Sequence, residues 1–271
     1  MIFFILFILF FILFNVLTFY FILSFIALLY MKFLVFILFL FINIFFSWIL
    51  VLFFFFWIMF FFRNLEVVHP LRLFIISSMS RLIIIFFRIK IIIHNKELIP
   101  LHNNLVIYSN HKTNFDPFII ASFFPRNISF TPKNELYFGK MGWFLSPLFN
   151  FSKCILIQRN NNRETIKNIL KGIENIKKKL AIVVFYECGI KNINSDKIIN
   201  SLDGSFKIAL KSHSDILPIS LKGIFNIRGK CWFRKKKIEV FIHKSLTFEK
   251  IKNNSTREIN LQVTNVINSV L

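Results

Sequence analysis

The sequence predicts an α/β domain, a sandwich of helices on a mostly parallel or mixed sheet, preceded by a helical membrane region. Two observations lead to this prediction. Residues 1–62 are almost entirely apolar and contain one charged side chain, Lys32. From about residue 101 onward, short apolar runs alternate with segments of helical periodicity, and strands alternating with helices are typical of an α/β fold.

The membrane region consists of two apolar runs, residues 2–30 and 33–61. Each exceeds the roughly 20 residues that a helix needs to cross a bilayer. At the membrane centre a Leu, Ile or Phe contributes about −0.3 to −0.6 kcal/mol, whereas a lysine costs about 2.5–3.5 kcal/mol. We therefore expect two spans with Lys32 at the turn between them, although residues 43–47 leave a third span open. A cleaved signal peptide is not expected, because the start is not basic and the run is too long.

Charge is concentrated after the apolar runs. Residues 63–271 hold 33 Lys and Arg against 13 acidic residues, a net charge of +20. The basic residues that follow the last span closely are Arg63, Arg72, Arg81, Arg88 and Lys90. By the positive-inside rule, they place the remaining chain on the cytoplasmic face of a multi-pass membrane protein. A strongly basic domain attracts anions such as lipid head groups, acidic carriers or nucleic acid. No nucleic-acid partner is expected, because nucleotide bias explains much of the Phe and Lys content.

Residues 63–100 are expected to connect the membrane region to the main domain. Pro70 opens an apolar run with sparse arginines that extends to about Phe87, which is typical of a helix in the membrane interface. An ordinary core helix has the same pattern, so both interpretations stay open. The predicted division is a transmembrane region at 1–62, an interfacial helix and connecting strand at 63–100, and a cytoplasmic domain at 101–271.

The main domain contains several candidate strands and two amphipathic helices. The predicted strands are the apolar runs Leu105–Ile107, Ile128–Phe130, Cys154–Ile157, Ala181–Phe185 and Ile216–Ile219. The first helix carries an apolar stripe made of Ile166, Ile169, Leu170, Ile173 and Ile176. The last helix starts at a capping box of Ser255 and Glu258. The basic run 234–237 is expected at a solvated or lipid-facing edge.

Cys154, Cys188 and Cys231 are the only cysteines, and none forms a Cys-x-x-Cys pair. An odd number without paired spacing argues against a disulfide framework or a cysteine-based zinc site. The count suits a reducing compartment.

His111 and Asp116 lie on a loop between the strand ending at Ile107 and a helix that begins near Pro117. Catalytic side chains are usually presented by such loops on a rigid scaffold. The pair alone is weak, because Asp116 followed by Pro117 also makes a good helix start. A second, independent set of motifs is needed to assign chemistry to it.

That set of motifs is present. Asn110-His111-Lys112-Thr113-Asn114-Phe115-Asp116 resembles the Asn-His-x4-Asp signature of the glycerolipid acyltransferases, and most closely that of the bacterial 1-acylglycerol-3-phosphate acyltransferases. Five further blocks follow in the family's order. Lys133–Leu136 resembles its Lys-x-Glu-Leu segment, Ile155–Asn160 its Ile-Asp-Arg strand end, and Phe185–Lys191 its Phe-Pro-Glu-Gly-Gly-Ile-Lys variant. The segments Gly204–Ala209 and Asp215–Ile219 resemble its last two blocks. Five blocks in order, within residues 85–225, form a specific signal.

Three positions depart from the family's pattern. Tyr186 stands at its proline, Cys188 at its glycine, and Gln158 at the acidic residue before its arginine. Loss of a glycine removes easy access to positive φ, so the departures bear on the acceptor-binding loop.

The resemblance implies a fold and a set of roles. It implies a glycerolipid-acyltransferase-like sandwich, with His111 as general base and Asp116 orienting its imidazole. The implied substrate-binding residues are Lys133, Arg159, Glu187, Gly189 and Lys191. Arg159, Lys191 and Lys133 would bind the acceptor's phosphate, and Glu187 would orient these cations or the glycerol. No cofactor and no metal are expected.

The implied reaction is acyl transfer from acyl carrier protein or coenzyme A, both anionic thioester carriers, to the free hydroxyl of lysophosphatidate, giving phosphatidate. Two alternatives stay open: acylation of another lysophospholipid, and an inactive member that acts as a basic membrane-bound binding protein. A lipase-type hydrolase is disfavoured because the sequence contains no Gly-x-Ser-x-Gly.

Overall fold

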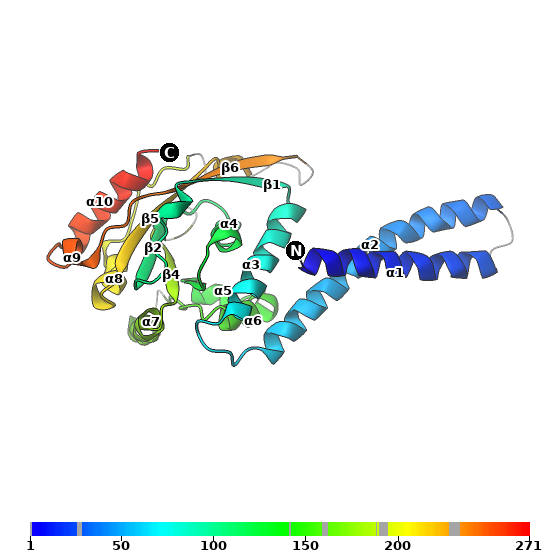
Figure 1. The fold of residues 1–271 in the computed structure, drawn as a ribbon, viewed down its shortest axis with the longest axis horizontal. Helices are drawn as coiled ribbons and strands as arrows, with labels where there is room; N and C mark the ends of the chain where they lie inside the picture. The colour runs from blue at the N-terminus through cyan, green and yellow to red at the C-terminus, as the bar shows by residue number, and fades with distance from the viewer. Residues whose placement is uncertain are drawn as a thin grey trace. The chain divides into compact units, whose positions relative to one another are not determined.

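The chain forms two compact units, residues 1–63 and 64–271, which we describe one at a time (Figure 1). The computed structural model describes residues 2–25, 29–140, 142–158, 162–187, 189, 195–227 and 234–271.

The first unit consists of two helices, α1 (Ile2–Phe25) and α2 (Leu29–Phe61). Both are long and apolar enough to cross a membrane. We had expected Lys32 at the turn between the two helices. It lies instead in the first turn of α2. Its Nζ donates to the Leu23 carbonyl oxygen at 3.4 Å, in the last turn of α1, where carbonyl groups lack a helical partner. The helix α2 continues without a break through residues 43–47, the region that left a third span open.

Polar side chains join the two apolar helices. The buried Asn43 side chain donates from Nδ2 to Asn15 Oδ1 at 3.3 Å and to Thr18 Oγ1 at 3.0 Å. Hydrogen bonds between helices in an apolar medium contribute about 0.6–2 kcal/mol each. These bonds therefore favour one pairing of α1 with α2 over other pairings of two almost uniformly apolar surfaces.

The second unit is built on a six-stranded sheet with the order β1-β6-β5-β2-β4-β3. All neighbouring strands are parallel except β5 and β6, which are antiparallel, so the sheet is mixed. The strands are β1 (Ile89–His94), β2 (Leu105–Ser109), β3 (Ile128–Phe130), β4 (Ala181–Phe185), β5 (Asp215–Lys222) and β6 (Lys236–Ile242). The predicted α/β class is confirmed.

Helices cover both faces of this sheet (Figure 1). On one side α3 (Pro70–Phe86) packs against α4 (Asp116–Phe123) and β1. On the other lie α7 (Asn162–Lys177), α8 (Lys207–Lys211), α9 (Phe248–Ile251) and α10 (Thr256–Asn268). The short helices α5 (Asn134–Phe138) and α6 (Gly142–Phe151) follow β3. The 3-10 turns are Lys96–Leu98, Asp203–Phe206 and Phe225–Ile227. The capping box predicted at Ser255 and Glu258 starts α10.

The segment 63–100, expected as a connection between the membrane region and the main domain, contributes a core helix and a strand to the second unit. The helix α3 buries Ile75, Ile76, Met79 and Leu82, as a core helix does, and β1 is an edge strand of the sheet. The buried guanidinium of Arg72 donates to the carbonyl oxygens of residues 65, 66 and 151, and burial lowers its pKa. Two of the arginines counted for the positive-inside rule therefore have structural contacts, since Arg81 Nε also donates to the Ser122 carbonyl oxygen at 2.8 Å.

The run Cys154–Ile157 is not a strand, contrary to our prediction. It makes a single parallel bridge, between Ile157 and Lys133. Ile155 N and Ile157 N donate to the carbonyl oxygens of Phe130 and Pro132, so the run lies along the edge of β3. A full ladder would need an N–H from residue 132 as well, and proline has none.

Two further expectations need correction. On α7, Ile173 and Ile176 are buried and Ile169 packs against the core, but Ile166 and Leu170 are 56% and 51% exposed, so two of the five predicted stripe residues do not pack. In the basic run 234–237, Lys236 is buried, because it begins β6 and its Nζ donates to the Phe87 carbonyl oxygen.

Tyr186 lies in the core and not in a substrate-facing loop. Its ring makes edge contacts with Tyr108 and Phe206, and only 1% of the residue is exposed. Its hydroxyl lies 3.1 Å from Thr264 Oγ1 on α10. Burial raises the pKa of the Tyr186 hydroxyl well above its ordinary value.

We predict that Tyr186→Ala lowers the free energy of unfolding by about 3–5 kcal/mol, because it leaves a cavity between two buried rings. Tyr186→Phe removes one hydrogen bond and should cost about 0.5–1.5 kcal/mol. Denaturant unfolding of the detergent-solubilised chain measures both values. Equal costs for the two variants would contradict the packing role of the ring.

Candidate active site

The predicted site residues that the structure describes follow strands that end at one edge of the sheet. The strands β2, β3, β4 and β5 are mutually parallel, so their carboxyl ends lie at the same edge. His111 follows β2, Lys133 follows β3, and Glu187 and Gly189 follow β4. Ligands of open α/β sheets bind outside the carboxyl ends of the strands, especially where the chain order reverses on either side of the sheet. The topology alone therefore brings together residues that are up to 78 positions apart.

His111 and Asp116 form a hydrogen-bonded pair. His111 Nδ1 lies 2.9 Å from Asp116 Oδ2, and the Asp116 side chain is fully buried. The imidazole is 18% exposed and stacks on the Phe185 ring, with centroids 4.3 Å apart. A proton on Nδ1 is held by the carboxylate, so Nε2 is the nitrogen that can accept a proton from a substrate.

Asp116 is fixed by the loop that it helps to build, residues 110–116, which we call the His-Asp loop. Its Oδ2 also accepts the backbone N–H of Lys112 at 2.7 Å and that of Thr113 at 3.0 Å, and its Oδ1 accepts the Thr113 hydroxyl at 2.5 Å. Asp116 is the first residue of α4, and the N-cap is Phe115. The carboxylate therefore does not serve as the N-cap of α4; it folds back onto the loop.

Asn110 ties the His-Asp loop to the end of β5. Its Oδ1 accepts Leu221 N at 2.8 Å, and its Nδ2 donates to the carbonyl oxygens of Leu221 at 2.8 Å and Asp196 at 3.0 Å. The residue is fully buried. Three hydrogen bonds from one buried amide fix the backbone directly before His111.

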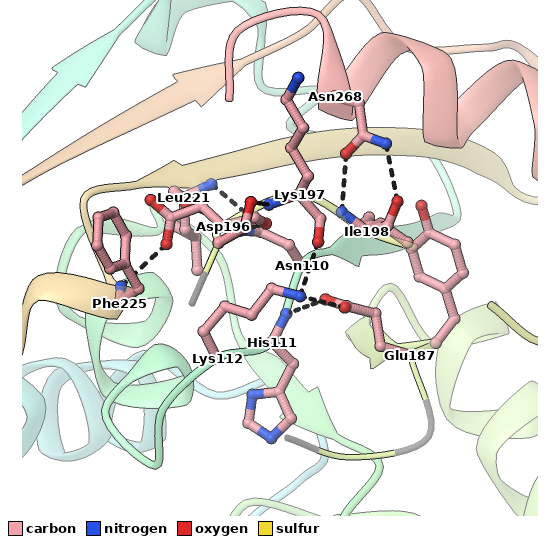
Figure 2. Close-up of polar contacts among 12 residues, drawn as sticks. Asn110, His111, Lys112, Glu187, Asp196, Lys197, Ile198, Leu221, Phe225 and Asn268 are labelled. Carbon is pink, nitrogen blue, oxygen red and sulfur yellow. Dashed lines mark hydrogen bonds and ion pairs between the residues drawn. The ribbon is translucent and has the colours of Figure 1, made fainter. Parts of the chain in front are cut away.

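Glu187 faces the His-Asp loop from the end of β4. Its Oε1 accepts the backbone N–H of His111 at 2.7 Å, and its Oε2 accepts from Lys112 Nζ (Figure 2). Only 6% of the Glu187 side chain and 1% of the Lys112 side chain are exposed. Both carboxylate oxygens thus bind protein groups, and the geometry supports a role in holding the loop. We had expected Glu187 to orient cations or glycerol.

Comparisons with known proteins identify the family to which this region is related. A family model described as Acyltransferase matches residues 90–222, which include His111, Asp116 and the five implied substrate-binding residues. Residues 90–222 form an acyltransferase-family domain.

Several proteins similar to this chain are named 1-acyl-sn-glycerol-3-phosphate acyltransferases. A probable one from Mycoplasma genitalium is 30% identical over 166 residues, covering 59% of this chain and 58% of that protein. One from Saccharomyces cerevisiae is 30% identical over 117 residues, covering 42% and 37%. One from Borreliella burgdorferi is 28% identical over 155 residues, covering 57% and 60%. The chain thus matches roughly half of the length of these relatives.

The fold has a counterpart among solved structures. The crystal structure of the 1-acyl-sn-glycerophosphate acyltransferase PlsC from Thermotoga maritima superposes with a TM-score of 0.61 at 20% identity, covering 73% of this chain and 77% of that one. At this identity the likeness concerns the fold, and it confirms the predicted acyltransferase-like sandwich.

The remaining site residues of this acyltransferase-family domain are placed as follows. Lys133 is half-buried, and its backbone bridges to Ile157 at the sheet edge. Gly189 has φ = 110°, a conformation that glycine adopts without strain. Arg159 and Lys191 lie outside the described residues, so their roles stay predictions.

Sequence reasoning missed Lys112 and Asn110 as parts of this acyltransferase site. Both stand within the motif that we quoted, but we gave neither a role. A lysine between the histidine and the aspartate of such a motif does not by itself indicate a buried ion pair, because its partner Glu187 lies 75 residues away in the sequence. Burial, which the sequence does not reveal, distinguishes it from the other lysines.

We predict that Lys112→Met lowers the free energy of unfolding by about 3–5 kcal/mol at neutral pH, because it leaves the Glu187 carboxylate buried and unpaired. Lys112→Met/Glu187→Gln should recover much of this loss. Detergent-solubilised protein unfolded at several pH values measures both variants.

The pH dependence of the free energy of unfolding distinguishes this buried pair from a surface pair. Burial already raises the pKa of Glu187 above its ordinary value of 4.5, and Lys112 opposes that rise. Without Lys112 the pKa rises further, so the folded state holds a proton that the unfolded state has released. The stability that this proton contributes is present below pH 4.5 and is lost as pH rises through the folded pKa. Lys112→Met should therefore gain stability relative to the double variant on acidification from pH 7; parallel pH curves would refute the pairing.

Proposed function

We propose that the protein is a 1-acylglycerol-3-phosphate O-acyltransferase. It would move a fatty acyl group from a thioester on acyl carrier protein or coenzyme A to the free hydroxyl of 1-acylglycerol-3-phosphate. The product is phosphatidate, a step of phospholipid biosynthesis. The observation that carries the proposal is the buried Asp116 carboxylate 2.9 Å from His111 Nδ1, in a chain whose relatives carry this name.

The geometry supports a general-base mechanism. His111 Nε2 takes the proton of the acceptor hydroxyl as its oxygen attacks the acyl carbonyl carbon and forms the new C–O bond. The C–S bond of the tetrahedral intermediate then breaks, and the thiolate leaves with the proton from the imidazolium. Asp116 stabilises that imidazolium and fixes its orientation, as the carboxylate of a Ser-His-Asp triad does. Base catalysis of this kind contributes about 10²–10⁴-fold, and the reaction requires neither a metal nor a cofactor.

Acceptor recognition requires cations at the same edge of the sheet. We assign the phosphate to Arg159, Lys191 and Lys133, on the resemblance of their motifs and, for Lys133, on its place after β3. Anionic donors suit a unit whose net charge, counted over residues 63–271, is +20. The helices α1 and α2 would hold the enzyme in the cell membrane as two spans, with the second unit on the cytoplasmic face.

The test is acyl transfer by the full-length chain in membranes, with acyl carrier protein and coenzyme A thioesters as donors and several lysolipids as acceptors. We expect His111→Ala to lower the rate by about 10²–10⁴-fold, because it removes the general base. Asp116→Asn should also lower it strongly, because it favours the wrong tautomer. His102→Ala is the matched control, since His102 is exposed in the turn before β2.

Each possible outcome has a distinct meaning. Equal rates for wild type and His111→Ala would refute the enzyme proposal and favour a basic lipid-binding protein. Transfer to lysophosphatidate that is no faster than transfer to choline-bearing or neutral lysolipids would refute the assigned acceptor. Arg159→Ala should raise KM for the phosphate monoester more than for the other lysolipids, because it removes a forked contact to phosphate.

A further inference from the structure

The C-terminal helix α10 contacts a short segment that also contacts both neighbours of His111. This segment, residues 196–198, is called the bridging segment below, and Figure 2 shows its polar contacts. Asn268, the last residue of α10, makes two hydrogen bonds to the backbone of this segment. Its Oδ1 accepts Ile198 N at 2.9 Å, and its Nδ2 donates to the Ile198 carbonyl oxygen at 2.9 Å. The Ile198 side chain is buried in the core that α10 shares with the sheet.

The bridging segment holds the His-Asp loop on both sides of His111. The Lys197 carbonyl oxygen accepts from Lys112 Nζ at 2.9 Å. The Asp196 carbonyl oxygen accepts from Asn110 Nδ2 at 3.0 Å. A displacement of the segment would therefore loosen the two residues whose side chains fix the backbone of His111.

The same segment is anchored at its other end to the turn after β5. The Asp196 carboxylate accepts Gly223 N at 2.6 Å and Phe225 N at 2.9 Å. Burial raises the pKa of this carboxyl group, and the two backbone N–H groups oppose the rise. Asp196 thus fixes one end of the segment and Asn268 the other, with the contacts to the His-Asp loop between them.

We propose that Asn268 is a positioning residue of the acyltransferase site, acting through the bridging segment on Asn110, Lys112 and thereby His111. It lies outside residues 90–222, the part of the chain that the family model matches. The proposal extends the functional unit to the C-terminal helix. Its kinetic readout rests on the proposed acyltransferase function.

The alternative is that Asn268 only fastens α10 to the core. That role predicts a loss of stability without a change in the turnover of the folded enzyme. Other contacts already fasten the helix: Tyr186 pairs with Thr264, and Ser220 Oγ donates to the Ile267 carbonyl oxygen at 2.8 Å. Loss of Asn268 alone therefore leaves α10 attached, and the two roles are separable.

The experiment compares Asn268→Leu with Asn265→Leu, an exposed asparagine one turn earlier on the same helix. Full-length variants are assayed well below their unfolding temperatures, and amide hydrogen exchange is followed in peptides covering residues 107–116 and 195–201. For Asn268→Leu we expect kcat to fall by about 10- to 100-fold with KM within about twofold, because a small displacement of a base is costly. Exchange should accelerate in both peptides, and Asn265→Leu should change neither readout.

Faster exchange at 195–201 with unchanged exchange at 107–116 and unchanged kcat would overturn the proposal, as would a loss of rate that only follows the unfolded fraction. If Asn268→Leu does not fold, Asn268→Ser and Asn265→Ser take their places in the same comparison. A wild type without acyl transfer would refute the proposed function instead. In that case exchange at 107–116 alone decides whether Asn268 positions the loop.

Discussion

The site depends on one constraint: the Asp116 carboxylate is removed from water and must be satisfied by the loop that surrounds it. It accepts two backbone N–H groups, the Thr113 hydroxyl and His111 Nδ1. A buried carboxylate without such donors would be expensive, so the loop conformation and the ionised acid stabilise each other. The same contacts orient the imidazole, because they fix the position of Asp116 Oδ2, which accepts from His111 Nδ1. Orientation of the base is thus a consequence of folding this loop.

A second layer of buried charge holds that loop against the sheet. The pair of Lys112 and Glu187 joins the ends of β2 and β4, and Glu187 also accepts the His111 N–H. Buried pairs contribute little net stability on average, since desolvation offsets the attraction, but breaking one is costly. Such a pair penalises every arrangement that separates its partners. The pair therefore favours the backbone position of His111 in which its N–H donates to Glu187.

The features predicted from the sequence are local ones. His111 and Asp116 are five residues apart, so one motif contains both, and the strands β2 and β4 are short apolar runs with clear ends. The contacts that fix them are not local: Lys112 meets Glu187 across 75 residues and Asn268 meets Ile198 across 70. The strand β6 was missed because it starts in a run of lysines, which does not predict a buried strand. Lys236 can be buried there because its Nζ donates to the Phe87 carbonyl oxygen. The run at Cys154 was assigned as a strand because its apolar residues do not reveal that Pro132 lies opposite.

Tyr186, one of the three departures from the family's motif, is easier to understand in the structure than in the sequence, whereas Cys188 lies outside the described residues. A tyrosine in place of a proline would alter a substrate loop if its side chain faced the substrate. Tyr186 instead directs its ring between Tyr108 and Phe206 and its hydroxyl to α10. Among the described residues of this turn, Gly189 has a positive φ, and the sequence keeps a glycine there. The substitution therefore adds core packing on the side of the turn away from His111, and it strengthens the link between this turn and the helix that carries Asn268.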